Sequence, residues 1–282
     1  MAEPVIFDTD IGTDIDDAYA LALLLNCPEL ELLGVTIGHG PTRDRAKIAL
    51  KMLHLAGRNE VRVAAGSESE AAVNQAAWAE SFDLLDVISQ PAGEFIVETI
   101  AERPGEITVI AVGPFTNLAD AIRLDAEIMH KAKRVIIMGG CMGLPEGATP
   151  QPYPEYNAKT DAVATKMFLG SSESITLVPL DVTRSVPLPD HNRRLLAQAD
   201  DPLCAALTEL YEYWPGETPL LHDPLAVAMA VSPRFCGTQQ MRVSVGDDGS
   251  TISDDSGTPM SVCATVEVDA FLNFFMSRLL TG

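Results

Sequence analysis

Short runs of β-branched and aliphatic residues alternate with longer amphipathic stretches along most of this 282-residue chain. Six of the runs are apolar at nearly every position, which is typical of parallel strands that are covered on both faces. The expected strands are Val5–Phe7, Leu32–Ile37, Val61–Ala64, Ile107–Val112, Val135–Met138 and Ile175–Val178.

The stretches between these strands have apolar residues at helical spacing. In Asp17–Leu25 they stand at positions 18, 21, 22 and 25, which form one stripe along a helix. Four further stretches look similar, namely Asp44–Ala56, Gly93–Glu102, Asn117–Ile122 and Asp161–Leu169. Alternating strands and helices predict right-handed βαβ units in an α/β fold with an open, mostly parallel sheet flanked by helices.

The last part of the chain is less regular. Met241–Val245 and Ser261–Val266 are expected to be late strands around an acidic turn, and Phe271–Leu280 a closing helix. Because no repeat or low-complexity linker interrupts the pattern, we expect residues 1–282 to form a single domain.

Polar or glycine-rich segments follow several expected strands, and ligands of such sheets bind outside the carboxyl ends of the strands. Asp8–Asp17, with five aspartates, follows the first strand, Gly38–Gly40 the second and Gly113–Asn117 the fourth. Gly139–Asn157, with four prolines and four glycines, follows the fifth. Structureless loops longer than about 12–15 residues are usually functional, so we expect the active site at this edge.

The five aspartates need more than one explanation. A helix N-cap accounts for Asp14 or Asp16, but not for Asp8, Asp10 and Asp17 as well. Two carboxylates about 4 Å apart repel by about 1 kcal/mol in water and by about 4 kcal/mol at an effective dielectric constant of 20. Since all the candidate ligands are oxygens, the cluster predicts a hard cation, Ca²⁺ or Mg²⁺.

Charge and cysteine usage exclude other classes of function. A net charge of −21 argues against nucleic acid or an anionic membrane as partner, although acidity alone does not name a substrate. The five widely spaced cysteines indicate neither a disulfide framework nor a zinc site. No signal peptide and no apolar run of about 20 residues is visible, so we expect a cytoplasmic enzyme.

Several blocks resemble one known family. DTDIGTDIDDA, at Asp8–Ala18, resembles the signature D-x-D-x-G-x-D-D-A of inosine–uridine nucleoside hydrolases, with two extra residues in the turn. Further blocks follow in the family's order, namely AVGPFTNLA (111–119), PEYNAKTD (154–161), LDVTRSV (180–186) and LLHDPLAVA (220–228). Together they cover residues 5 to about 230, and the family's open α/β sheet agrees with the pattern of strands and helices.

The resemblance implies calcium-dependent hydrolysis of the N-glycosidic bond of ribonucleosides, which yields ribose and free base for nucleoside salvage. It implies that Asp10, Asp17, Asp223 and the backbone carbonyl of Val112 hold the Ca²⁺. Asp10 would also be the general base toward the attacking water. His222 would lie on the base side of the pocket, where it is a candidate acid for the leaving base. Acidic surroundings suit a reaction in which positive charge builds on the ribose.

The resemblance also assigns the ribose contacts. Asp16, Glu155 and Asn157 would hold the ribose hydroxyls. His39 stands where the family has an Asn that orients the nucleophile and the ribose, and Thr149 stands where another Asn contacts the 5′-hydroxyl.

The base side is less defined by the resemblance. A nucleobase needs an aromatic surface, and Tyr213 and Trp214, just before the block at His222, are the best candidates. Asp8 is expected to support Asp10 structurally. Asp14 lies in the two-residue insertion, and the sequence leaves open whether it caps the helix, faces solvent or takes part in the chemistry. The family commonly forms homodimers or homotetramers, and we expect the same here.

Two alternatives stay open at this point. Asp8 and Asp10 also approximate the D-x-D motif of haloacid-dehalogenase-type phosphatases, in which Asp8 would be the nucleophile and Mg²⁺ the metal. A non-catalytic nucleoside-binding relative is the other alternative, because His39 and Thr149 depart from the family pattern. The sequence does not determine the preferred base.

Overall fold

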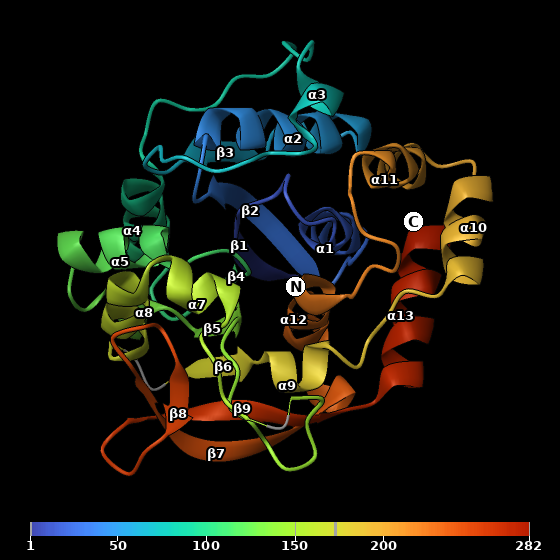
Figure 1. Ribbon diagram of the computed structural model, residues 1–282. Coiled ribbons are helices and arrows are strands. Elements are labelled where there is room, and N and C mark those ends of the chain that lie inside the picture. The colour runs from blue at the N-terminus through green and yellow to red at the C-terminus, as the bar shows by residue number, and fades with distance from the viewer. Residues whose placement is uncertain (1, 150, 172–173, 282) are drawn as a thin grey trace.

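The computed structural model describes residues 2–149, 151–171 and 174–281. Within these residues nine strands form one sheet in the order β3-β2-β1-β4-β5-β6-β9-β7-β8 (Figure 1). The strands are β1 (Glu3–Thr9), β2 (Leu30–Ile37), β3 (Arg62–Ala65), β4 (Thr108–Ala111), β5 (Arg134–Met138), β6 (Ile175–Val178), β7 (Cys236–Val245), β8 (Thr251–Ser253) and β9 (Thr258–Val266).

Strands β1 to β6 pair in parallel, and β9 continues the parallel arrangement beside β6. Only β7 runs antiparallel to its neighbours β8 and β9. The prediction of an open, mostly parallel sheet is therefore confirmed. The two late strands are longer than predicted, and the short β8 was not predicted.

The central strands are apolar at nearly every position because helices cover both faces of the sheet. In β1, Val5 and Phe7 belong to one hydrophobic core while Ile6 belongs to the other, and all three are fully buried. Figure 1 shows α4, α5 and α8 together on one side of the sheet and α1, α12 and α13 on the other.

The predicted helices are present, with small differences at their ends. They are α1 (Asp16–Leu25), α2 (Thr42–Leu55), α4 (Ala92–Glu102), α5 (Thr116–Leu124), α8 (Ala162–Leu169) and α13 (Val268–Thr281). The sequence did not predict α3 (Ala76–Ala79), α6 (Ile128–Lys131), α7 (Tyr156–Thr160), α9 (Leu180–Thr183), α10 (Asp190–Gln198), α11 (Pro202–Glu212), α12 (His222–Val231) or η1 (Pro233–Phe235). Helix α12 is buried at almost every position, so it has no apolar stripe that the periodicity could reveal.

The strand order places a crevice between β1 and β4. The chain runs from β1 outward to β2 and β3, and then crosses back to β4 on the other side of β1. Such a reversal opens a binding crevice at the carboxyl ends of the two strands. Gly113, just after β4, lets these ends approach, because a Cβ atom there would lie 2.8 Å from the backbone nitrogen of Asp10.

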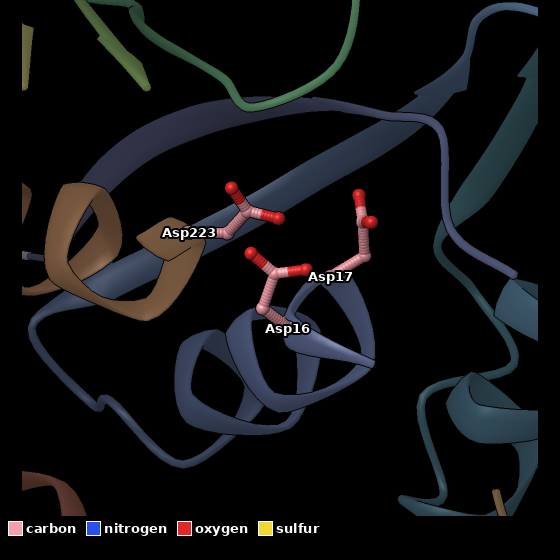
Figure 2. A group of neighbouring side chains, drawn as sticks. All are labelled: Asp16, Asp17 and Asp223. Carbon is pink, nitrogen blue, oxygen red and sulfur yellow. The ribbon is translucent and has the colours of Figure 1, made fainter. Parts of the chain in front are cut away.

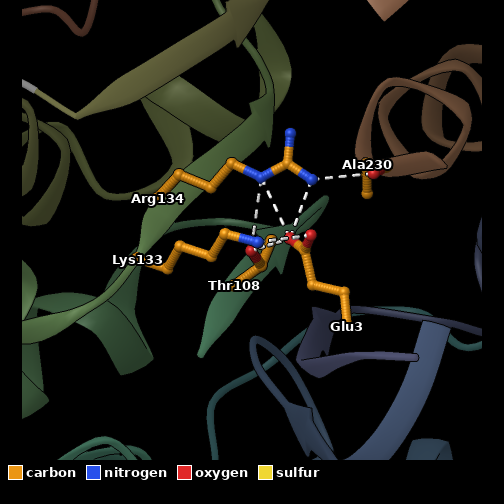
Figure 3. A network of polar contacts seen from close by, with 5 residues as sticks. All are labelled: Glu3, Thr108, Lys133, Arg134 and Ala230. Carbon is orange, nitrogen blue, oxygen red and sulfur yellow. Dashed lines mark hydrogen bonds and ion pairs between the residues drawn. The ribbon is translucent and has the colours of Figure 1, made fainter. Parts of the chain in front are cut away.

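The amino end of the sheet carries a closed polar network, which Figure 3 shows. The carboxylate of Glu3, at the start of β1, accepts hydrogen bonds from Lys133 Nζ and Arg134 Nη2, both at 2.7 Å, and from the hydroxyl of Thr108. Arg134 Nη2 also donates to the carbonyl oxygen of Ala230 at 2.7 Å. The network ties β1, β4, β5 and α12 together.

Candidate active site

A buried arginine holds the turn that links β1 to α1. Arg45, on α2, is 0 % exposed, and its Nη1 donates to the carbonyl oxygens of Asp10 and, at 3.0 Å, Ile11. Its Nη2 donates to Thr13 Oγ1 at 2.9 Å. The sequence analysis did not select Arg45, although it lies close in the chain to the acidic segment. Its guanidinium fixes the turn and places a permanent positive charge beneath it.

Three carboxylates meet where two helices begin. Asp16 and Asp17 lie in the first turn of α1, and Asp223 lies in the first turn of α12 (Figure 2). One carboxylate oxygen from each lies within 4.8 Å of the others, and all three side chains are buried. The hydroxyl of Thr9 donates to Asp17. The partial positive charge at a helix N-terminus favours an acidic residue, so the two convergent helix ends help to tolerate this group.

Crowding perturbs the pKa values of these acids. Burial, followed by repulsion from neighbouring carboxylates, raises the pKa of Asp16, Asp17 and Asp223 well above the usual value. Burial also raises the pKa of Asp10, to about 6, although the Arg45 guanidinium opposes the rise. A divalent cation would relieve this repulsion, and a buried set of carboxylate oxygens fits a hard ion such as Ca²⁺.

Backbone and amide groups complete the floor of the site. Asn157 Nδ2 donates to the carbonyl oxygens of Val112 at 2.6 Å and Met138 at 3.2 Å, which joins the ends of β4 and β5. The carboxylate of Glu155 caps α7 by accepting from the backbone nitrogens of Asn157 at 3.0 Å and Ala158 at 3.1 Å. These contacts hold both side chains in place for a ligand.

These groups line one cavity of about 360 Å³ at the carboxyl end of the sheet. Of the residues predicted from the sequence, it brings together Asp10, Asp16, Asp17, Val112, Glu155, Asn157, His222 and Asp223. His39, Tyr213 and Trp214 lie outside its lining.

His222 is a neutral group in this environment. Its Nδ1 lies 2.7 Å from Thr183 Oγ1. Burial, and then the nearby Arg184 guanidinium, lower the pKa of His222 to about 4. At neutral pH the imidazole therefore takes part as a hydrogen-bonding group and not as a cation.

The residues outside the cavity lining make other contacts. His39 Nε2 lies 3.2 Å from the hydroxyl of Tyr156, which does line the cavity. Tyr213 ends α11 with 42 % of its surface exposed. The ring of Trp214 packs on that of Tyr211 with centroids 5.9 Å apart. The predicted stacking of Tyr213 and Trp214 on a base stays a prediction.

The long loop after β5 is anchored by Asp181, which the sequence analysis did not select. Its carboxylate accepts from the backbone nitrogens of Met142 and Leu144, both at 2.7 Å, and from Thr149 Oγ1 at 2.8 Å. Thr149 is thus 1 % exposed and lies outside the cavity lining. The block at 180–186 was the available signal for Asp181. Residue 150 of this loop lies outside the described residues.

Asp8 and Asp14 have different surroundings. Asp8 is 0 % exposed, and its Oδ1 accepts from Thr36 Oγ1 at 2.5 Å and Asn117 Nδ2 at 2.7 Å. Asp8 therefore joins β1 to β2 and α5, in keeping with a structural role. Asp14 is exposed at the cavity, and its Oδ1 accepts from the backbone nitrogen of Ile15 at 2.6 Å.

Comparison with known proteins places the chain among nucleoside hydrolases. Residues 5–273 match the family described as "Inosine-uridine preferring nucleoside hydrolase". Uridine nucleosidase 1 of Arabidopsis thaliana is 29% identical over 99% of this chain and 93% of its own. The pyrimidine-specific ribonucleoside hydrolase RihA of Citrobacter koseri is also 29% identical, over 88% of this chain and 86% of its own.

Solved structures agree with this placement. The purine-preferring ribonucleoside hydrolase of Gardnerella vaginalis has a TM-score of 0.82 and 27% identity, and the match covers 99% of this chain and 98% of that one. A plant nucleoside hydrolase has a TM-score of 0.88 at 24% identity, with both chains fully covered, which supports the fold alone. Among the described residues no helix is long and apolar enough to cross a membrane.

Proposed function

The chain belongs to the inosine-uridine preferring nucleoside hydrolase family, and from this premise we propose that its acidic cavity binds one calcium ion and one ribonucleoside. The chain is a nucleoside hydrolase, which cleaves the N-glycosidic bond and releases ribose and free base. The observation that carries the proposal is the buried group of Asp16, Asp17 and Asp223, in which one carboxylate oxygen from each residue lies within 4.8 Å of the others.

The calcium ligands in this proposal are the carboxylates of Asp10, Asp17 and Asp223 and the carbonyl oxygen of Val112. All four groups line the cavity, and a carbonyl has a second lone pair beside the one that accepts from Asn157. A bound calcium ion would supply positive charge that acidifies a water and orients the ribose hydroxyls.

Asp10 is the proposed base. Burial raises the pKa of Asp10 to about 6, and the guanidinium of Arg45 opposes a further rise. At neutral pH its carboxylate therefore accepts a proton from the attacking water. Arg45 also fixes the backbone carbonyl of Asp10, which limits the motion of this residue.

Three side chains are proposed to hold the ribose. The carboxylate of Asp16 and the Oδ1 atom of Asn157 accept hydrogen bonds from ribose hydroxyls. The carboxylate of Glu155 already accepts hydrogen bonds from three backbone N–H groups, and its remaining lone pairs accept from a ribose hydroxyl. The negative charge around the ring stabilises the positive charge that builds on the ribose as the bond to the base breaks.

His222 is proposed to assist the departing base as a neutral imidazole. When its Nδ1 accepts from the hydroxyl of Thr183, its Nε2 carries the proton and donates a hydrogen bond to the base. This hydrogen bond stabilises negative charge on the leaving base without requiring an imidazolium ion.

The phosphatase alternative does not fit the position of Asp8. A nucleophile must reach its substrate, whereas Asp8 is fully buried, lies outside the cavity lining and is bonded to Thr36 and Asn117. The non-catalytic alternative is tested by turnover itself.

A panel of inosine, adenosine, guanosine, uridine and cytidine tests the proposal, with free base measured after incubation in calcium chloride. We expect release of base from at least one nucleoside, and uridine is the first to try because two relatives are named for uridine or pyrimidine nucleosides. Binding without release of any base would favour the non-catalytic alternative. The predicted cytoplasmic location and homodimer or homotetramer are tested by fractionation and by mass measurement in solution.

A further inference from the structure

The two edges of the sheet differ in whether another segment of the chain covers them. At one edge, Ala64 of β3 forms a parallel bridge with Ile88, whose backbone nitrogen donates to the carbonyl oxygen of Val63 at 3.0 Å. At the other edge, the three-residue β8 covers only Val243–Val245 of β7. Since β7 begins at Cys236, most of its outer side lies beyond the end of β8.

The uncovered part of β7 faces solvent. We call it the open edge, and it comprises Gly237, Thr238, Gln239, Gln240 and Met241. The first four of these residues are exposed and the fifth is half-buried. Strand β9 pairs with them on one side, and among the described residues no strand pairs with them on the other. Figure 1 shows β7 along the lower rim of the molecule.

The backbone of the open edge has groups that point away from β9. The carbonyl oxygen of Arg242 accepts from the backbone nitrogen of Asp254, just after β8, at 3.0 Å. The residue opposite Arg242 in β9 is Pro259, which has no N–H to donate. Because alternate residues of a strand direct their N–H and C=O groups to the same side, those of Gln240 and Thr238 also point outward.

The open edge lacks the features that usually prevent strand pairing. Exposed edges in natural proteins are commonly protected by charged side chains or proline, and Gly237–Met241 has neither. The chain has a net charge of −21, yet β7 contains no acidic residue, and Arg242 is its one charged residue. Two copies of so acidic a chain repel each other, so a surface without carboxylates is where they approach at the lowest electrostatic cost.

We propose that the open edge pairs in antiparallel fashion with the same edge of a second copy of this chain, about a two-fold axis at Gln239, so that the two sheets become continuous. Gln239 then lies opposite itself, and Thr238 of each copy lies opposite Gln240 of the other. These outward-facing residues exchange about four backbone hydrogen bonds. The two Arg242 side chains lie at opposite ends of the contact.

A second copy fits this edge better than a strand of another protein. The same segment supplies both sides of the contact in one register, and no charged side chain of the open edge selects a different sequence. Because both copies use the same surface, the contact closes on itself and does not continue into a fibre. The contact is also separate from the cavity, so it does not depend on the proposed calcium and nucleoside chemistry.

Sedimentation velocity of the full chain over a wide range of protein concentration tests the proposal. Gln240→Pro removes one outward N–H group and is compatible with pairing to β9, because proline is tolerated at a strand edge where its nitrogen faces solvent. We expect this variant to have half the mass of the wild type at the highest concentration. Gln240→Ala, the matched control, loses the same side chain but keeps the N–H group, and it should have the wild-type mass. Circular dichroism checks that each variant is folded.

Cross-linking tests the register without depending on the proline variant. In an antiparallel pair without mutual hydrogen bonds the Cα atoms are about 4.5 Å apart, so Gln239→Cys should form a disulfide between copies when diamide takes up the two electrons and two protons. In Gln240→Cys the two new thiols lie on diagonal positions about 7–8 Å apart, so this control should cross-link far less. The five native cysteines are buried.

Three results would overturn the proposal. One is a wild type that stays monomeric at every concentration, which would leave the open edge to solvent or to a strand of another protein. Another is an unchanged mass in folded Gln240→Pro, which would place the contact between copies on a different surface. The third is equal cross-linking of Gln239→Cys and Gln240→Cys.

Discussion

The two ends of the same sheet differ in the partners of their carboxylate groups. At the amino end, Glu3 is surrounded by Lys133, Arg134 and Thr108 (Figure 3). At the carboxyl end, Asp16, Asp17 and Asp223 are buried against one another (Figure 2).

The pKa values of the carboxyl groups at the two ends shift in opposite directions. Burial opposes ionisation of Glu3, but hydrogen bonds from Lys133, Thr108 and Arg134 outweigh it, and the pKa of Glu3 is lowered. At the carboxyl end, burial raises the pKa of Asp223 well above its usual value, and repulsion from Asp16 adds to the rise. The charges at the amino end therefore stabilise the folded protein. The crowded carboxylates at the carboxyl end destabilise it unless a cation binds among them.

The largest expected effect is on activity at the carboxyl end. Asp223→Asn should lower kcat/KM for the best nucleoside of the panel by about a thousandfold, because it removes a proposed calcium ligand from the reaction centre. The same variant should unfold at a higher temperature than the wild type in EDTA, since it removes like-charge repulsion. Full activity, or a lower unfolding temperature in EDTA, would contradict the proposal that the carboxylates at the carboxyl end repel one another and hold a cation.

Arg45 is the exception at the carboxyl end, since it is the cation that supports the acidic turn. Arg45→Met should lower the free energy of unfolding by about 3 kcal/mol, because it leaves the carbonyl oxygens of Asp10 and Ile11 without their donor and removes the positive charge near the buried carboxylates. Chemical denaturation measures the change. Arg43→Met, at an exposed position of the same helix, is the matched control and should stay within about 0.5 kcal/mol of the wild type. Similar values for both variants would contradict the assigned role.

The pH dependence of stability should differ between the two ends. The raised pKa values of Asp8, to about 7, and of Asp16, Asp17 and Asp223 mean that the folded protein binds more protons than the unfolded chain. Their contribution is complete below the unfolded pKa and is lost as pH rises through the folded values. Without calcium the protein should therefore unfold at a lower temperature at pH 8 than at pH 5. Equal or rising unfolding temperatures across this range in EDTA would count against the raised pKa values.

The smallest expected effect belongs to the amino end. Glu3→Gln should lower the free energy of unfolding by about 1 kcal/mol at most, because the carboxylate is partly exposed and solvent screens its ion pairs. Its stabilising contribution is present above the unfolded pKa and is lost as pH falls through the lowered folded value. The kcat/KM should be unchanged, since Glu3 lies at the opposite end of β1 from the cavity. A loss of activity at constant stability would contradict this separation.

The two ends also differ in how far the sequence predicts them. The apolar runs predict the sheet, and the aspartates at and after the end of β1 predict its acidic edge. Both patterns can be recognised because they are local in the sequence. Asp223 could be assigned only through the family resemblance, since α12 is apolar on every side and shows no helical stripe.

Long-range contacts were not predictable in the same way. Tyr156 lies beside a loop without periodicity, and its partner His39 comes from another strand end. Arg45 resembles any other arginine of an amphipathic helix until the fold places it beneath the acidic turn. The Glu3 network likewise joins residues more than a hundred positions apart.

Removal and return of calcium tests the central claim most directly. The protein is treated with EDTA, freed of chelator and assayed for release of base from the best nucleoside of the panel, before and after addition of calcium chloride. We predict loss of base release in the calcium-free protein and full recovery on addition, accompanied by a rise in unfolding temperature. Undiminished release of base from protein shown by elemental analysis to contain no metal would contradict the claim.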